Sequence, residues 1–582
     1  MLEGMATRTG TAHVVTTTRK YKDRVYHTHL LRRSYREDGK VKNETLGNLS
    51  HLPEPIIDLI RRALQGETFV PVSEAFEIIG SRPHGHVQAA ALAMQRLNIA
   101  ALLGGTASRE RELVLAMIAA RIVAPNTKLA TARQWHTTTL AEDFGVASAT
   151  EDDLYAAMDW LLDRQDRIQN KLAARHLGEG SLVLYDLSSS YFEGSCCPLA
   201  ARGYSRDGRR GTLQVNYGLL TDVRGCPVAV SVFEGNTADS LTFVPEVQRV
   251  RETFGIEQVV MVGDRGMISK KAIAQMRQAD GIEWITALKS ASIRALVEQQ
   301  HLQPGLFDET NLVEIESPDY PGERLIACRN DALAKLRARK RESLLAATED
   351  QLRLIQARVQ AGKLQGQDRI GVRVGKVVNR HKVAKHFVLA IEDHAFRFER
   401  NAASIAAEAA LDGLYIIRSS VPPQRMDGPE CVRNYKALAN VERAFRSIKT
   451  VDLKVRPIHH RTERRVRAHI FLCMLAYYVE WHIKEAWREL TFADTAQQLK
   501  ATRDPVAPAE RSASARAKAA SKTLPDGSPA HSFATLMSEL ATIVRNTCRT
   551  PGAGDEAPTF QVLTTPSAAQ ARALDLVRAI HL

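Results

Sequence analysis

Apolar residues recur at helical spacing through residues 83–178. Val87–Leu103 and Glu110–Val123 both show this period, and so does Asp153–His176. One face of the last stretch has the three- and four-residue spacing of an amphipathic helix: Leu154, Ala157, Met158, Leu161 and Leu162. The region is therefore expected to be helical, and either plain helix packing or a helical module that holds DNA would produce this pattern.

Residues 1–82 follow a different pattern, in which strand-like runs precede a helix. After a polar tail, strands are predicted near Arg24–Tyr35 and Lys40–Leu49, joined by the turn dipeptide Asp38-Gly39. A short helix is predicted at Glu54–Leu64. This segment is expected to form a small α+β module.

From Ser181 onward the apolar runs become short and strand-like. Three strands, a helix, a strand, a helix and a strand are predicted in turn: Leu182–Tyr185, Gln214–Thr221, Pro227–Phe233, Leu241–Phe254, Gln258–Val262, Ser269–Asp280 and Ile282–Leu288. This is the element order of an RNase H-like α/β fold.

Residues 290–410 interrupt that order. A long charged helix is predicted at Asn330–Gln360, followed by strands at Arg369–Val378 and His386–Ile391. Between Lys335 and Lys385, 14 Lys/Arg oppose 4 Asp/Glu, a net charge of +10. Such a run favours contact with a polyanion over a merely solvated surface. Four cations of the long helix are expected to bind DNA from a solvated face: Arg337, Arg339, Lys340 and Arg341.

The first pattern resumes with a predicted strand at Leu414–Ser419 and helices at Asn434–Lys449 and Arg464–Trp487. Beyond about residue 500 the chain is rich in Ala, Ser and Pro, which is typical of a linker, and weak helical periodicity returns at Ser532–Arg545 and Ala568–Ile580. Six segments are expected: an α+β module (1–82), a helical, DNA-binding region (83–178), the first part of the core (179–289), a basic insertion (290–410), the second part of the core (411–490), and a linker with a C-terminal tail (491–582).

Composition narrows the class of protein. Of 582 residues, 44% are hydrophobic and 25% charged, which excludes wholesale disorder and fibrous folds, and the net charge of +13 favours nucleic acid as a partner. Seven scattered cysteines form no C-x-x-C pair and do not align with histidines at zinc spacing, so reduced thiols are expected. Met1–Lys20 lacks the apolar run of a signal peptide, and the apolar stretch Ile470–Val479 is too short to span a bilayer. A cytoplasmic protein without a membrane partner is expected.

Two aspartates each follow a buried-strand pattern. Asp186 comes directly after Leu182–Tyr185, and Asp264 directly after Val259–Gly263. A carboxylate at the carboxyl end of a strand lies at the edge of a sheet, whereas an unpaired charge inside it would cost several kcal/mol. Either residue could also simply cap the next element. Together they are candidates for a site at one edge of the core.

A third carboxylate, Glu442, lies in the predicted helix beside its apolar stripe of Val441, Phe445 and Ile448. From Arg433 to Arg467 there are 11 Lys/Arg against 3 Asp/Glu, a net charge of +8. A lone acid among so many cations suits a metal ligand that faces a phosphate backbone.

Around Glu442 the sequence resembles insertion-sequence DDE transposases of the "IS four" group, whose mark is Y-x2-R-x3-E-x6-K. Tyr435, Glu442 and Lys449 fit this spacing, and Leu438 stands where the arginine is expected. Five further motifs carry the resemblance: Tyr185–Gly194, Gly203–Gly208, Glu234–Asp239, Gly263–Gly266 and Asp452–Pro457.

The resemblance implies an RNase H-like, retroviral-integrase-like catalytic core that is interrupted by a β-rich insertion. Asp186, Asp264 and Glu442 would be the catalytic residues and the ligands of two Mg²⁺ ions, for which Mn²⁺ can substitute, with Asp186 bridging both. Five residues would contact DNA: Tyr435, Lys449, Arg456 and, in place of the missing arginine, Arg443 or Arg446.

The implied function is cleavage of the ends of an insertion sequence and their joining to target DNA. The expected partners are the terminal inverted repeats, target DNA and further copies of the chain, as a homodimer or higher oligomer. Two alternatives stay open: an RNase H-like nuclease or resolvase without strand transfer, and a non-catalytic, domesticated DNA-binding protein. The intact Asp186, Asp264 and Glu442 speak against the second, and the spaced signature favours transposition over the first.

Overall fold

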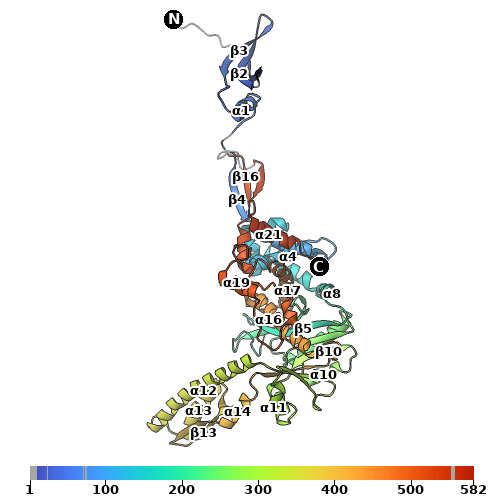
Figure 1. Ribbon diagram of the computed structural model, residues 1–582, viewed down its shortest axis with the longest axis vertical. Coiled ribbons are helices and arrows are strands. Elements are labelled where there is room, and N and C mark those ends of the chain that lie inside the picture. Colours follow the sequence, from blue (N-terminus) through green and yellow to red (C-terminus); the bar gives the residue numbers. More distant parts are fainter. Residues whose placement is uncertain (1–9, 23, 70, 72–74, 552–556) are drawn as a thin grey trace. The chain divides into compact units, whose positions relative to one another are not determined.

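The chain folds into two units in the computed structural model, which describes residues 10–22, 24–69, 71, 75–551 and 557–582 (Figure 1). One unit comprises Met1–Ser81 and Asn546–Leu563, and the other Arg82–Arg545 and Thr564–Leu582. Residues 1–9 of the predicted polar tail lie outside the described part of the chain.

The smaller unit contains an antiparallel sheet of three strands in the order β1 (Thr11–Tyr21), β2 (Arg24–Glu37) and β3 (Lys40–Asn48). The predicted turn is confirmed: Asp38 and Gly39 have φ of 50° and 76°, the left-handed values that a tight hairpin needs. Helix α1 (Glu54–Leu64) has the predicted bounds. Strand β1 was not predicted; its Thr- and Val-rich sequence is polar, yet it pairs along its whole length with β2.

A second sheet of the chain has the order β17 (Thr559–Leu563), β16 (Val544–Arg549) and β4 (Glu77–Pro83). Strands from the two ends of the sequence therefore pair with each other. The ion pair between Arg549 and Glu77 joins the same two strands, β16 and β4.

The region predicted to be helical is helical. Its elements are α2 (Gly85–Arg96), α3 (Ile99–Leu103), α4 (Arg109–Val123), α5 (Lys128–Gln134), α6 (Leu140–Asp143), α7 (Glu151–Leu162) and α8 (Gln165–His176). The predicted stretch 87–103 is interrupted at Asn98, whose φ is 51°. Leu154, Ala157, Met158 and Leu161 of α7 are fully buried, as their spacing predicted. Helices α4 and α7 pack against α17 (Glu463–Ala486), which ties this region to the second part of the core.

A nine-stranded mixed sheet forms the centre of the larger unit in the described part of the chain, in the order β11-β12-β15-β10-β9-β5-β7-β6, with β8 paired to β7. The strands are β5 (Ser181–Tyr191), β6 (Ala201–Arg202), β7 (Leu213–Thr221), β8 (Pro227–Glu234), β9 (Val259–Gly263), β10 (Ile282–Ala287), β11 (Leu312–Ile315), β12 (Arg324–Arg329) and β15 (Leu414–Ser419). Strands β5, β9 and β10 are parallel, and the other pairs are antiparallel. Helices α9 (Asp239–Glu252), α10 (Lys270–Met276) and α11 (Ser290–Glu298) follow β8, β9 and β10. The order β8-β7-β5-β9-β10 fits the predicted RNase H-like core.

The insertion is helical rather than β-rich, so that prediction is wrong. It contains α12 (Asp331–Gln360), α13 (Gln367–Arg380), the hairpin of β13 (Phe387–Ile391) and β14 (Phe396–Arg400), and α14 (Ala402–Ala409) (Figure 1). The predicted strand at 369–378 is part of α13, because Ile370, Val374 and Val378 recur every four residues and are buried in a core shared with α12. Strands β11 and β12, at its start, extend the main sheet instead.

The predicted helix 434–449 is broken into α15 (Gly428–Lys436), α16 (Leu438–Arg446) and a π-helical turn, Ser447–Val451. Beyond residue 490 the prediction of a linker is wrong, whereas the weak helical periodicity of the tail is confirmed by two helices. Helices α18 (Leu499–Thr502), α19 (Ala513–Ser521), α20 (Phe533–Ala541) and α21 (Ala568–Arg578) follow there. Leu540, Ala573 and Val577 are fully buried in the main core, so these helices pack against the rest of the larger unit.

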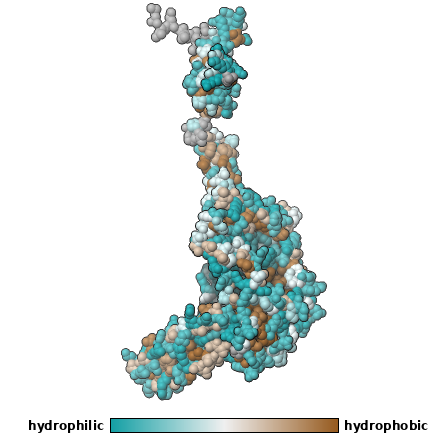
Figure 2. All heavy atoms as spheres, viewed as in Figure 1, coloured by the Kyte–Doolittle hydropathy of each residue, from teal (hydrophilic) through white to brown (hydrophobic). Residues whose placement is uncertain are grey.

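Among the described residues, no single helix is long and apolar enough to cross a membrane; α4 and the segment Lys128–Thr137 would suffice only as a pair bent by 92°. Hydrophilic residues cover most of the face of the larger unit that Figure 2 shows.

Candidate active site

Asp186 and Asp264 lie side by side at the edge where β9 ends. Strands β5 and β9 are parallel, and their pairing ends with Tyr185 opposite Gly263, so each aspartate is the residue that follows this last pair. The prediction that Asp186 ends its strand is wrong, because β5 continues to Tyr191 by pairing with β7. The predicted juxtaposition with Asp264 nevertheless holds, since β9 ends at this level.

Glu442 reaches this edge from α16, which packs against β5. Val441, Ala444 and Phe445 are buried beneath the helix, and Glu442 on the adjoining face is exposed. The side-chain amide of Asn440 donates a 2.8 Å hydrogen bond to the Val223 carbonyl in the β7–β8 turn. Helix α16 is thus held both by its apolar face and by that turn.

The three carboxylates act on one another electrostatically. Burial first, and then the charges of Asp264 and Glu442, raise the pKa of Asp186 to about 7. The 2.8 Å hydrogen bond from the Leu187 N–H and the charge of Arg206 act in the opposite direction. Asp264 and Glu442 are themselves exposed. The structure therefore brings the three predicted carboxylates into one electrostatic group.

Tyr435 and Asp264 are in direct contact. The Tyr435 hydroxyl donates to Asp264 Oδ1 at 3.2 Å. Burial first, and then the neighbouring Asp264 carboxylate, raise the pKa of this tyrosine, so it remains a neutral hydrogen-bond donor. The predicted DNA contact Tyr435 thus lies beside the acidic triad, the name used below for Asp186, Asp264 and Glu442.

Two other residues that were predicted to contact DNA, Lys449 and Arg456, bind the buried carboxylate of Asp207. Lys449 Nζ lies 2.5 Å from Asp207 Oδ1 and donates to Ser188 Oγ at 3.1 Å. Arg456 forms an ion pair with the same Asp207 oxygen. Burial lowers the pKa of Lys449, and Asp207 opposes this change. A cavity of about 280 Å³ opens beside this cluster, lined by Tyr191, Asp207, Arg209, Lys449, Thr450, Lys454 and Arg456.

Arg443 and Arg446 are exposed on α16. Arg443 donates to the Asn440 side chain one turn earlier. Leu438, which replaces the arginine of the signature, is half-buried and packs against the main core. The two exposed arginines and Leu438 therefore lie on the same helix as Glu442.

Comparison with known proteins identifies the family. Residues 180–479 match the Transposase DDE domain family, and residues 14–70 match the IS1634 family transposase, N-terminal domain. The chain belongs to the DDE transposase family. Among solved structures it is similar to a piggyBac transposase synaptic complex with hairpin DNA, at 7% identity, with 81% of this chain and 84% of that chain covered and a TM-score of 0.33. No curated protein matches the chain.

Two charged residues beside the candidate site were not singled out from the sequence, although their motifs were. Asp207 lies in the Gly203–Gly208 motif, and its Oδ2 accepts a 3.0 Å hydrogen bond from the Tyr191 N–H. Arg206, of the same motif, pairs with Asp239 of the Glu234–Asp239 motif, and its backbone N–H donates to Ser189 Oγ at 3.0 Å. Charged residues inside loop motifs were the available signal, but their partners are distant in sequence.

The insertion of the transposase faces the core across a cationic cavity of about 450 Å³. Its lining includes Arg265, next to Asp264, from the core, with Arg294, Lys340 and Lys382 from the insertion. The expectation that all four cations at the start of α12 lie on a solvated face is wrong. Arg341 binds Asp412 through two hydrogen bonds of 2.6 and 3.0 Å and is only partly exposed. Arg337, Arg339 and Lys340 are exposed, although the Arg337 side chain also donates to backbone carbonyls.

Proposed function

We propose that this DDE transposase cleaves the ends of an insertion sequence and joins them to target DNA, with Asp186, Asp264 and Glu442 as its catalytic carboxylates. The observation that carries this proposal is their convergence from β5, the end of β9 and α16, close enough that two of them raise the pKa of the third. The RNase H-like order of the strands supports it. The spacing of Tyr435, Glu442 and Lys449 supports placement in the "IS four" group.

The acidic triad suits hard divalent cations. Its ligands are carboxylate oxygens, which Mg²⁺ and Mn²⁺ prefer. A carboxyl group whose pKa is raised by burial and by two neighbouring carboxylates is one whose charge a bound cation would stabilise. Asp186, Asp264 and Glu442 would hold Mg²⁺, with Mn²⁺ as a substitute. When bound, the ions would lower the pKa of the attacking hydroxyl and stabilise charge on the leaving oxygen.

The chain's own residues would position the DNA and its reacting phosphate. Tyr435, through its hydrogen bond to Asp264, would orient that carboxylate and contact the same strand. Lys449 and Arg456 would offer positive charge to a phosphate beside the triad, and Asp207 would hold both side chains in place until DNA arrives. Arg443 and Arg446, exposed on the helix of Glu442, would bind the adjoining backbone.

The proposed reaction consists of a phosphodiester hydrolysis followed by a phosphodiester exchange. Water first attacks the phosphate at the end of the element, and the departing oxygen becomes a free 3′-hydroxyl. That hydroxyl then attacks a phosphate of the target, forming one phosphodiester bond as another breaks. Because each joining step exchanges like bonds, neither ATP nor a covalent enzyme intermediate is required. The DNA partners would be the terminal inverted repeats and the target, held by a homodimer or higher oligomer.

An assay that separates binding, cutting and joining tests this function. Asp186→Asn, Asp264→Asn and Glu442→Gln should each abolish end cleavage and strand transfer in Mg²⁺, yet retain DNA binding in a band-shift assay, because phosphate contacts supply most of the affinity. Glu489→Gln, which alters an exposed carboxylate paired with Arg572, is the matched control and should act normally. Cleavage by the unaltered protein without any joined product would identify a nuclease instead. Turnover by Glu442→Gln would refute the site.

A further inference from the structure

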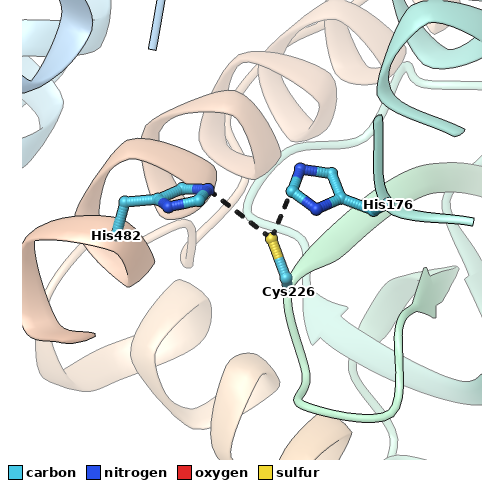
Figure 3. A group of neighbouring side chains, drawn as sticks. All are labelled: His176, Cys226 and His482. Carbon is cyan, nitrogen blue, oxygen red and sulfur yellow. Dashed lines mark hydrogen bonds between the residues drawn. The ribbon is translucent and has the colours of Figure 1, made fainter. Parts of the chain in front are cut away.

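Two histidines and a cysteine, none of which belongs to the acidic triad, converge in the larger unit. His176 is the last residue of α8, Cys226 follows the β7–β8 turn, and His482 lies on α17 (Figure 3). Cys226 Sγ lies 4.0 Å from His176 Nε2 and 3.9 Å from His482 Nε2. The potential ligand atoms of the three residues all lie within 4.8 Å of one another, and no other group of three or more His, Cys, Asp or Glu among the described residues is as close. We call them the His-Cys-His cluster.

The chemistry of the cluster differs from that of the acidic triad. Imidazole nitrogen and thiolate sulfur are borderline-to-soft ligands that suit zinc, whereas carboxylates suit magnesium. Cys226 is fully buried and His482 is 8% exposed. Burial lowers the pKa of His176 to about 4 and that of His482 to about 3. Both Nε2 atoms face the same sulfur (Figure 3).

The distances are close to those of a tetrahedral zinc site. With Zn–S bonds of about 2.3 Å and Zn–N bonds of about 2.0 Å, sulfur and nitrogen ligands lie about 3.6 Å apart. The observed sulfur–nitrogen separations are at most about half an ångström longer, so rotation of the side chains would close the site. We propose that His176, Cys226 and His482 bind one zinc-class ion, with water as the fourth ligand.

The groups around the cluster would support a bound ion. Asp222 Oδ1 accepts a 2.9 Å hydrogen bond from the Cys226 N–H, and its other oxygen pairs with Arg224 at 2.7 Å. The charge of Arg224, which would otherwise repel a cation, is thus partly neutralised. The Tyr478 hydroxyl lies 2.9 Å from His176 Nε2, where it would instead bond to the water ligand. Cys226 would bind as a thiolate, and its proton would leave to solvent, as is usual for zinc thiolates.

Such an ion would join three parts of the fold. Helix α8 belongs to the helical region, Cys226 to the turn between β7 and β8 of the central sheet, and α17 to the second part of the core. The β7–β8 turn that carries Cys226 also accepts the Asn440 hydrogen bond on α16, two residues before Glu442. The ion would therefore stabilise the turn against which the helix of Glu442 rests. Its binding does not depend on the chemistry at the acidic triad.

Cobalt substitution tests the proposal on the full-length protein. The chelator-treated protein, titrated with Co²⁺, should develop a sulfur-to-cobalt charge-transfer band that saturates at one ion per chain, and Zn²⁺ should abolish it. Cys226→Ser and His482→Gln should lose this band and weaken Zn²⁺ binding by more than about 100-fold. Cys196→Ser, at an exposed cysteine, and Asp186→Asn should both keep it. Retention of the band by Cys226→Ser, or no band in the unaltered protein, would overturn the assignment.

Two further measurements cover variants that fail to fold. X-ray absorption of the zinc-loaded, unaltered protein should show one sulfur at about 2.3 Å and two nitrogens at about 2.0–2.1 Å. Zinc should also raise the thermal midpoint of the unaltered protein and of Cys196→Ser alike, because it binds only the folded state. A shell of oxygen without sulfur, or an unchanged midpoint, would show that the cluster is only hydrogen-bonded.

Discussion

Asp186 and Asp207 are two carboxylates of the same core whose surroundings have opposite charge. Asp207 is 1% exposed, and the cations of Lys449 and Arg456 compensate its charge. Asp186 lies close to Asp264 and Glu442, whose negative charges raise its pKa, whereas the hydrogen bond from the Leu187 N–H and the charge of Arg206 lower it. Balanced charge is what a structural carboxylate needs, whereas excess negative charge is favourable only if a cation joins the site. This contrast suggests that Asp186 acts in the chemistry and that Asp207 supports the cations beside it.

The variant Asp186→Asn tests most directly whether Asp186 acts in the chemistry, in contrast to Asp207. The rates of cleavage and joining should fall by more than about 1,000-fold, because the variant lacks a carboxylate that helps to stabilise charge in the transition state. The thermal midpoint should hold or rise by a few degrees, since the amide removes repulsion from two carboxylates. Kinetic assays and thermal unfolding of the same preparation measure both effects. A clear loss of stability would mean that Asp186 is mainly structural.

The converse change is Asp207→Asn. It should lower the free energy of unfolding by about 3 kcal/mol, because two partly buried cations lose their shared partner. Denaturant unfolding measures this, and Asp166→Asn is the matched control, since Asp166 is 84% exposed in its pair with Arg249 and should change little. If both variants unfold at the same denaturant concentration, the charge balance at Asp207 contributes nothing to stability.

The insertion offers the same contrast on one helix. Arg341→Ala should destabilise the protein by about 2 kcal/mol, because it removes a bidentate pair with Asp412 in which both side chains are largely buried. Arg339→Ala with Lys340→Ala should leave stability unchanged and weaken binding of end and random DNA equally, since phosphates do not distinguish sequences. The slope of log K against log salt should become shallower by about 0.9 for each phosphate that is no longer neutralised. A weakening confined to the specific end would contradict this assignment.

Glu480 provides the smallest and most selective test. Burial raises its pKa from 4.5 to about 8, although Lys484 lies 2.5 Å away. Between these values the unfolded chain releases a proton that the folded chain keeps, so this contribution to stability is complete below about pH 4.5 and is lost as pH rises towards 8. Glu480→Gln stays neutral, so its thermal midpoint should gain a few degrees on the unaltered protein between pH 5 and pH 8.5. A difference that is independent of pH would show that Glu480 stays ionised when folded.

Local pattern was sufficient for elements whose apolar period is unambiguous. Helix α1 and strand β15 have their predicted bounds, and the stripe Val441, Phe445 and Ile448 is buried as expected. The local hydrophobic pattern gave a wrong prediction where the two-residue period of a strand and the four-residue period of a helix overlap. Residues 369–378 alternate like a strand over a few positions, but contact with α12 selects the four-residue period instead.

The candidate site was predictable in part. Asp186, Asp264 and Glu442 could be selected because each follows or adjoins an apolar run and because their motifs resemble those of a family. Asp207 could not be paired with Lys449 and Arg456, since nothing local specifies an ion pair across so many residues. The His-Cys-His cluster was missed for the same reason: its members are far apart in sequence and match no zinc spacing.

The sequence by itself determined the period of most elements, the order of strands and helices in the core, the basic character of the chain, and the residues able to act as acids. Those properties depend on neighbouring positions and on composition. Only the tertiary structure decided which of the many charges are compensated, that the Ala-rich C-terminal segment packs into the core, and that His176, Cys226 and His482 meet. These outcomes depend on which surfaces pack together, and burial then sets the free energy of each charge through its distant partners.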